Sequence, residues 1–266
     1  MAFNPNELVL ERVRSVEEYD PATGELVGRY TQIEDPSLTT SADGTDVVDA
    51  LGVPIATFYR NTQGTFSFTN SLFSLDLAAS QFGTKKVIAD SENKIQVPVS
   101  ETVAIAEGAV ALKYVPVGTE GSEIKFVKVI NADNTFGATY TVSTTADAEA
   151  KTFTVDAANK KITMPEGVEG KVFVNYVRET ENAASVARST ETDIEVKKLI
   201  VNVIFCDPCN INLKRAGAII MERAQIDPSS VDLSLTMEGK HAASYLLKKE
   251  YCNEEGKLFE IIIAED

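Results

Sequence analysis

The sequence has no tryptophan, a single histidine (His241) and only three cysteines among its 266 residues. One histidine excludes an HExxH zinc site, and any Ser-His-Asp triad would have to use His241. Three cysteines leave at least one thiol unpaired, which is typical of synthesis in a reducing cytoplasm rather than of a disulfide scaffold. These scarcities exclude several common kinds of catalytic and structural site.

Long apolar runs are also missing. The first residues, "MAFNPNELVLERVRSVEEYDP", are charged throughout and contain no apolar stretch typical of a signal peptide. The longest apolar stretch, residues 199–206, is interrupted by Asn202 and falls well short of the ~20 residues that a membrane helix needs. We therefore expect a chain made in the cytoplasm that has no membrane partner.

Basic residues are few: 25 Lys and Arg stand against 40 Asp and Glu, which gives a formal charge of −15. A protein that grips nucleic-acid phosphates depends on Lys and Arg to displace counterions, so this balance argues against one. Strong acidity favours solubility and repels polyanions. A hydrophobic fraction of 44% is that of an ordinary globular protein.

Catalytic motifs are absent as well. No serine lies in a GxSxG elbow, and no GxGxxG follows an expected strand. The segment "MPEGVEGKV" lacks both the first glycine of a phosphate loop and a Ser or Thr after Lys171. The carboxylates form no pair in an apolar setting that would suit acid-base work. The sequence therefore predicts that the protein is not an enzyme and that it has no catalytic residue and no cofactor.

One cluster leaves alternatives open. "CDPC" places Cys206 and Cys209 at the spacing of a zinc half-site, which His241 and Cys252 could complete. The spacing between His241 and Cys252 is wider than in compact zinc modules, and a redox CxxC usually begins a helix. Because "KKLIVNVIFCDPC" is rich in β-formers, the favoured interpretation is a strand that ends in a Pro-containing turn flanked by buried free thiols, with no metal.

Strand patterns dominate what is present. The runs are short and are bounded by Gly, Pro, Asn or Asp, as in sandwiches and barrels. The expected strands are Pro54–Tyr59, Gly64–Thr69, Val103–Ile105, Ala109–Val115, Glu123–Ile130, Thr139–Ser143, Lys151–Val155, Lys161–Met164, Lys171–Arg178, Asp193–Phe205, Ala216–Arg223, Val231–Met237 and Leu258–Ala264.

Two segments have helical spacing. Ser74–Phe82 has Ser74 as N-cap, Asp76 in the first turn and Gly83 at the C-terminal cap, and Leu75, Ala79 and Phe82 form its apolar face. His241–Tyr251 is a weaker candidate that could also be a loop. Ahead of the first helix, Phe66 and Phe68 alternate with Thr and Ser and are expected, like Phe73, to lie in the core.

The chain changes character twice, which predicts two domains. Residues 96–184 form a run of short strands, and the polar stretch 178–193 resembles a linker. We expect an immunoglobulin-like β-sandwich module at 96–184, inserted into a host domain made of residues 1–95 plus 185–266. The fold class is mainly β, with one short helix flanking the host.

Two stretches together resemble the major tail proteins of long-tailed bacteriophages, the subunits of the tail tube. The first is "DVVDALGVPIATFYRNTQGTFSFTNSLFSLDLAASQFGTKK", residues 46–86, and the second is residues 209–266 with "GAIIMERAQI" and "DLSLTMEG". About 100 residues carry the likeness. The resemblance implies a β-sandwich host with a flanking helix and a long hairpin that contacts neighbours, and an inserted module facing outward.

The resemblance also implies a structural virion protein that forms stacked, hexameric rings. Such rings build a tube that conducts DNA at ejection and meets other tail proteins at its ends. Six copies at −15 each carry a formal charge of −90, and acidic groups on the lumen would keep DNA from sticking. We expect residues 1–35 to form an arm that reaches the next ring and is disordered in the monomer.

Two other classes fit the same strand pattern. One is a different virion shell component, such as a capsid decoration or a tail terminator protein. The other is a β-sandwich adhesin or binding module, although the chain shows no EF-type acidic loop and no tryptophan.

Overall fold

The computed structural model describes residues 7–231, 236, 239–250 and 256–264. The chain is mainly β, with 56% of its residues in strands, and the described residues contain a single α-helix. It divides into two compact units, Met1–Lys86 with Val186–Asp266 (the host unit) and Val87–Ser185 (the inserted unit). The first junction precedes the expected 95/96 boundary because two short strands, β5 (Val87–Ile88) and β13 (Ala184–Ser185), pair with each other.

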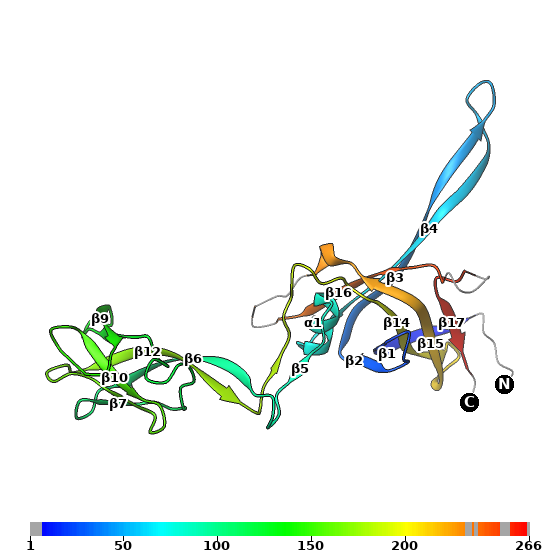
Figure 1. Cartoon of the computed structure of the whole chain (residues 1–266). Helices are drawn as coiled ribbons and strands as arrows, with labels where there is room; N and C mark the ends of the chain where they lie inside the picture. Colours follow the sequence, from blue (N-terminus) through cyan, green and yellow to red (C-terminus); the bar gives the residue numbers. More distant parts are fainter. Residues whose placement is uncertain (1–6, 232–235, 237–238, 251–255, 265–266) are drawn as a thin grey trace. The chain divides into compact units, whose positions relative to one another are not determined.

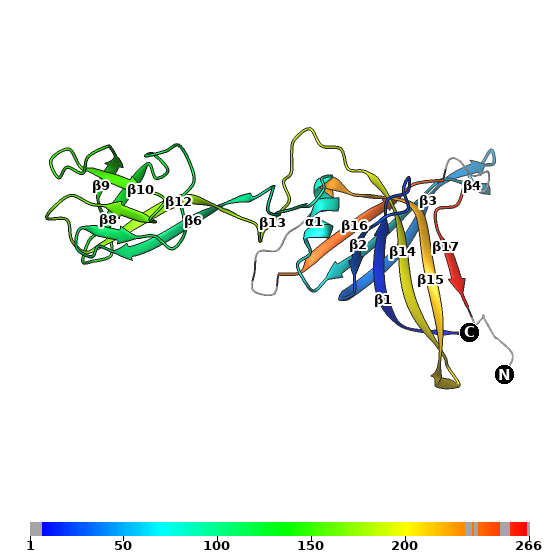
Figure 2. The ribbon, with the colours of Figure 1, turned by 60° about the horizontal axis from the view of Figure 1, so that its bottom comes forward.

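The host unit is built on one eight-stranded sheet with the order β2-β1-β14-β15-β16-β4-β3, and β17 also pairs with β15. The sheet curls into a nearly closed barrel (Figure 2). Its strands are β1 (Val9–Tyr19), β2 (Leu26–Tyr30), β3 (Ile33–Val48), β4 (Pro54–Asn70), β14 (Val196–Asp207), β15 (Asn210–Ile226), β16 (His241–Leu247) and β17 (Glu260–Ile263).

Where these strands form the barrel, every second side chain points into it and fills its interior. Leu199, Val201 and Val203 of β14 are buried, and the residues between them are half-buried, as expected for a strand with one face on the core. Phe68 stacks on Tyr245 of β16 with ring centroids 6.2 Å apart. The buried cluster comprises Val16, Tyr30, Phe66, Phe68, Leu77, Leu199, Val201, Val203, Met221, Ala224, Ile226, Ala243, Tyr245 and Leu247.

The predicted helix is confirmed as α1 (Leu75–Phe82), and four residues separate it from the end of β4. The Ser74 side chain accepts a hydrogen bond from the Leu77 N–H, and Gly83 ends the helix in the left-handed region at φ 67°. Its predicted apolar face is partly wrong, because Leu75 and Phe82 are only half-buried while Leu77 is fully buried.

Phe73 also departs from its expected place in the core, since 61% of it is exposed. It lies in the short link between β4 and α1, where its ring stacks on His241 at a centroid distance of 5.4 Å. Phe66 and Phe68 are buried as predicted, at 2% exposure each.

The helix considered for His241–Tyr251 is wrong. Residues His241–Leu247 form strand β16, in which His241, Ala243, Tyr245 and Leu247 are buried and the residues between them are half-buried. Apolar residues four apart satisfy both a two-residue and a 3.6-residue period, so a segment this short does not distinguish them. The expected strand at Val231–Met237 lies for the most part outside the described residues.

The expected N-terminal arm over residues 1–35 is also wrong where the structure describes it. Strand β1 lies between β2 and β14, with Val16 and Glu18 fully buried. Its apolar residues Leu10, Val13, Val16 and Tyr19 are three apart because irregularities between Leu10 and Arg12 and between Val13 and Ser15 shift the register. Because of these shifts, the sequence of β1 does not show the two-residue alternation of apolar side chains that is typical of a strand.

The inserted unit has its own seven-stranded sheet, ordered β6-β12-β8-β9-β10-β11-β7, and its own core around Ile124, Val127, Phe153 and Ile162. Most pairs are antiparallel, whereas β9 and β10 run parallel. The strands are β6 (Ile95–Ala104), β7 (Ala109–Ala111), β8 (Phe126–Ile130), β9 (Phe136–Val142), β10 (Thr152–Asp156), β11 (Lys161–Thr163) and β12 (Lys171–Thr180) (Figure 1).

Candidate functional site: an apolar arm and a polar pocket

The long hairpin of β3 and β4 extends beyond the host sheet (Figure 1). Strand β16 pairs with β4 only over Gly64–Asn70, and residues 39–63 are exposed throughout; this segment is called the arm below. About ten residues per strand at ~3.3 Å each carry its tip roughly 30 Å past the sheet.

The base of the arm contains a bulge. The register shifts between Ser41 and Asp43, and Asn61 on the opposite strand has a φ of 54°. An extra residue in one strand increases the local twist and bends the pair. The side-chain amide of Asn61 donates a 2.9 Å hydrogen bond to Asp43, which closes the bulge. This bend directs the arm away from the barrel.

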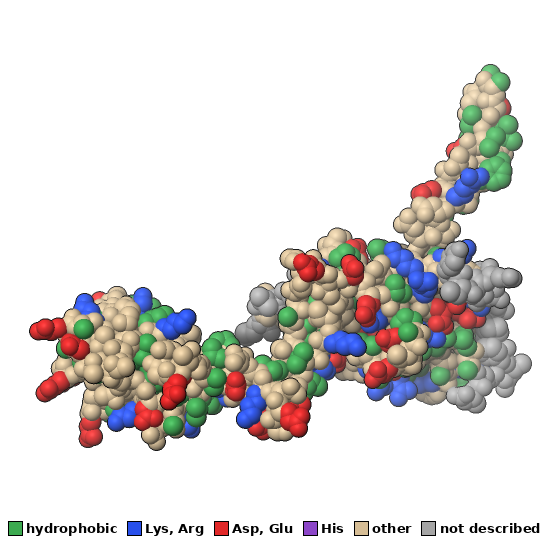
Figure 3. Space-filling view, viewed as in Figure 1, with side chains coloured by type: hydrophobic (Ala, Val, Ile, Leu, Met, Phe, Trp, Pro, Cys, Tyr) green, Lys and Arg blue, Asp and Glu red, His purple; other side chains and the backbone are tan. Residues whose placement is uncertain are grey.

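The arm is apolar on both faces, although no described residue of the barrel covers it. Side chains alternate along a strand, so Phe58 with Val47 and Tyr59 with Ile55 lie on opposite faces. Figure 3 shows green side chains gathered toward its end. Its exposed large apolar residues are Val47 (46%), Val48 (51%), Leu51 (89%), Val53 (56%), Ile55 (69%), Phe58 (54%) and Tyr59 (72%).

Local hydrogen bonds define the arm's conformation. The Asp49 carboxylate accepts from the backbone N–H groups of Leu51 (2.8 Å) and Val53 (2.9 Å) at the tip. The Thr57 hydroxyl donates to Asp46 across the strands at 2.6 Å. A two-stranded hairpin is only marginally stable alone in water, and exposed apolar patches mark interaction sites. The arm is therefore organised by its own hydrogen bonds, while its large apolar side chains stay exposed.

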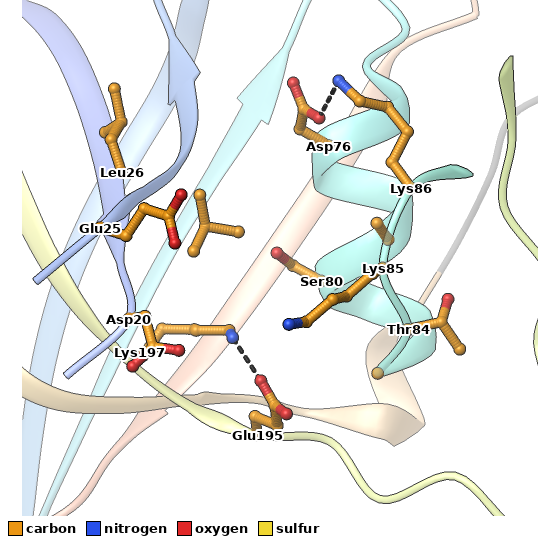
Figure 4. A pocket seen from close by; sticks show the side chains of 13 residues that line it. Asp20, Glu25, Leu26, Asp76, Ser80, Thr84, Lys85, Lys86, Glu195 and Lys197 are labelled. Carbon is orange, nitrogen blue, oxygen red and sulfur yellow. Dashed lines mark hydrogen bonds and ion pairs between the residues drawn. The ribbon is translucent and has the colours of Figure 1, made fainter. Parts of the chain in front are cut away.

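A polar pocket of about 450 Å³ lies between α1, the β1–β2 turn and the start of β14 (Figure 4). Lys86 forms an ion pair with Asp76 at 2.5 Å, and Lys197 forms one with Glu195 at 2.5 Å. Lys85 and Lys197 point into the cavity in Figure 4. Four carboxylates and three lysines line its wall, so their charges largely compensate one another.

Beneath this pocket lies a buried carboxylate that the sequence did not reveal. Glu18 is fully buried and accepts hydrogen bonds from the hydroxyls of Tyr30 (2.6 Å), Ser80 (2.8 Å) and Tyr245. Burial raises the pKa of Glu18 above its ordinary value, and the three hydroxyl donors oppose that rise. These bonds join β1, β2, α1 and β16, so the group fixes the helix to the barrel.

His241 has a comparable structural role. Its Nδ1 accepts from the Ser74 backbone N–H at 3.5 Å, and its Nε2 lies 2.8 Å from the Gln81 Oε1. The Gln81 amide in turn donates to the Ala242 carbonyl at 2.7 Å. Burial lowers the pKa of His241, which favours the neutral ring that these contacts require.

The zinc hypothesis gains no support from the described residues. The strand and the turn are confirmed as the end of β14 and the β14–β15 turn, and both thiols are free. Only Cys206 is buried, however, so the expected burial is wrong for Cys209, which is exposed on the turn. His241 pairs with Asn70 on β4 instead, and Cys252 lies outside the described residues. Within the described ranges, no three His, Cys, Asp or Glu residues gather in a geometry that could hold a metal ion.

A comparison of the chain with models of protein families found no match, and a comparison with curated proteins found none either. No helix in the described part of the chain is long and apolar enough to span a membrane.

Proposed function

We propose that this chain is a structural virion protein, the tail-tube subunit of a long-tailed bacteriophage. The resemblance of residues 46–86 and 209–266 to major tail proteins supports this assignment. Copies assemble as hexameric rings that stack into a tube, and other tail proteins bind its ends. The inserted unit is the immunoglobulin-like decoration that faces outward, and no catalytic step takes part.

The observation that carries the proposal is the arm. Residues 39–63 expose seven large apolar side chains on both faces of a hairpin. A monomeric protein rarely leaves such an element uncovered, because burial of apolar area is worth about 25 cal/mol per Å². A neighbouring copy supplies the missing cover, and rings that repeat the contact bury every arm.

The host sheet offers a second line of support. Strands β2 and β3 form the two ends of its strand order, so each has an edge without a partner in that order. Exposed edges promote uncontrolled aggregation unless they are covered, and a sheet continued around a ring covers them. The nearly closed barrel is thus a unit suited to edge-to-edge assembly.

The negative charge of the chain supports a role of the tube as a conduit for DNA. A ring of six copies carries a formal charge of −90, which disfavours adhesion of phosphates to its surface. DNA passes through such a lumen without specific contacts. The tube therefore guides the duplex rather than binding it.

Negative-stain electron microscopy of the purified chain tests the proposal. A tube subunit forms rings or hollow tubes about 100 Å wide, the scale of six domains of this size around a channel. Closed shells or cap-like particles would instead support a capsid decoration or a terminator protein. A chain that stays monomeric at high concentration would contradict the proposal.

A further inference from the structure

The inserted unit has a sheet face that its own core does not use. In β8, Val127 is fully buried and Val129 packs on the core, whereas Phe126, Lys128 and Ile130 alternate with them and lie on the opposite face. Phe126 is 41% exposed. The same alternation runs through β6, β12 and β9, so four neighbouring strands contribute to one outer face, called the outer face below.

Strand register gathers aromatic rings on the outer face. Phe173 of β12 lies opposite Lys128, and Phe136 of β9 lies opposite Ile130. The Phe136 and Phe173 rings meet edge to face with centroids 5.5 Å apart, and the Lys128 Nζ lies 5.5 Å from the Phe136 centroid. Phe136 remains 60% exposed, so its ring is available to a ligand.

Hydroxyl and amide groups surround the rings. The register places Thr139 and Thr141 of β9 opposite Lys128 and Phe126, and Thr102 of β6 opposite Phe173. On the same face the Asn175 amide donates a 2.8 Å hydrogen bond to the Ser100 hydroxyl. Each hydroxyl can both donate and accept, which suits a ligand covered with hydroxyl groups.

Two lysines, Lys128 and Lys171, lie on this part of the outer face, in a chain whose total charge is −15. Lys128 and Lys171 form no ion pair with any described carboxylate. Glu179, on the same face of β12, is eight residues from Lys171, which corresponds to ~26 Å along a strand, and it accepts from Gln96. An anionic ligand would therefore meet unpaired cations beside the aromatic rings.

We propose that the outer face binds an acidic polysaccharide, a chain of sugar rings that carries carboxylate groups. Phe136 and Phe173 offer apolar ring surface to the C–H face of a sugar, the Thr, Ser and Asn side chains bond its hydroxyls, and Lys128 and Lys171 pair with its carboxylates. Nucleic acid is disfavoured because two lysines are too few to neutralise the closely spaced phosphates of a nucleic-acid backbone. The inference stands independently of the proposed function in tube assembly.

Binding of the full-length chain to three soluble polymers tests the inference: polygalacturonate, which is a carboxylated polysaccharide, neutral dextran, and dextran sulfate as a control for charge alone. Titration calorimetry in 0.15 M salt should show saturable binding of polygalacturonate and weaker binding of the other two. Failure to bind polygalacturonate, or equal binding of dextran sulfate, overturns the proposal.

Variants locate the site. Phe136→Ala and Lys128→Ala should each weaken polygalacturonate binding about tenfold, a typical loss for one stacked or charge-paired group. Phe136→Tyr keeps the aromatic ring and should retain binding, whereas the matched control Lys161→Ala removes an exposed lysine on β11, outside the four strands of the outer face, and should have no effect. Unchanged thermal unfolding shows that each variant folds. If Phe136→Ala abolishes self-association instead, the face binds a second copy and the proposal fails.

Discussion

The Tyr30 hydroxyl on β2 donates a 2.6 Å hydrogen bond to the Glu18 carboxylate on β1, and both side chains are almost fully buried. Ser80 of α1 and Tyr245 of β16 donate to the same carboxylate. One carboxyl group thus joins four elements, the last of which, β16, lies more than 200 residues after β1 in the sequence. Lys197 is near enough to lower the pKa of Glu18, but burial has the larger effect.

The raised pKa of Glu18 predicts how stability depends on pH. Its contribution is fully present below its ordinary pKa of 4.5 and is lost as pH rises through the folded-state pKa, because the folded state then has to hold a buried charge. Glu18→Gln sets an amide against the hydroxyl donors and should cost about 1–3 kcal/mol at pH 4. The difference in free energy of unfolding between the wild type and Glu18→Gln should shrink as the pH rises to 7.

Urea unfolding of both proteins at several pH values measures this difference. Glu25→Gln, at an exposed site on the β1–β2 turn, is the matched control and should follow the wild type. A deficit for Glu18→Gln that stays constant from pH 4 to 7 would show that burial does not control this carboxyl group.

The lowered pKa of His241 predicts the opposite pH dependence. Its contribution to stability is present above its ordinary pKa of 6.5 and is lost as pH falls through the folded-state value, because protonation forces a charge into a buried site. His241→Phe keeps the stack on Phe73 but leaves Gln81 without its partner, which should cost about 1–3 kcal/mol at pH 7.5.

Below pH 6.5 the difference in free energy of unfolding between the wild type and His241→Phe should decrease. Urea unfolding of both proteins at several pH values measures this difference. Two unfolding curves that remain equally spaced down to pH 5 would argue that His241 stays neutral without any energetic cost.

Gly83 caps α1 at φ 67°, and a Cβ there would lie 2.5 Å from the Asp193 backbone carbonyl oxygen. Gly24 has a similar φ of 71°, but a Cβ at that position meets nothing within 4 Å. Gly24→Ala should therefore cost only the left-handed strain of about 1 kcal/mol, whereas Gly83→Ala should cost roughly 2–4 kcal/mol. Thermal unfolding distinguishes them, and equal losses would rule out the contact with Asp193.

The strand-to-helix change at residues 64–83 could be predicted from the sequence because its signals are local. Phe66 and Phe68 alternate, Ser74 caps the helix and Gly83 ends it, and the structure confirms each of these features. Strand β1 could not be predicted, since two register shifts depend on its pairing with β14. The Glu18 cluster was equally hidden, because its partners lie 12, 62 and 227 residues away.

The arm shows a different limit. Residues Pro54–Tyr59 are predicted as a strand, and they are part of one, but an apolar strand pattern does not distinguish a core from an uncovered surface. The same holds for Phe136 in the inserted unit, whose exposure depends on which face of β9 meets the core. Which face of a strand is buried depends on how the whole sheet packs, so the sequence of that strand alone does not reveal it.

Sedimentation velocity tests the central claim, assembly through the arm, most directly. Ile55→Glu with Phe58→Glu places a charge on each face of the arm, and Phe136→Glu is a control of similar exposure in the inserted unit. None of these side chains is buried, so far-UV circular dichroism should show the same β content in all proteins. The wild type and Phe136→Glu should sediment as rings or tubes and the double variant as a monomer. Assembly of the double variant to the same size as the wild type would contradict the account.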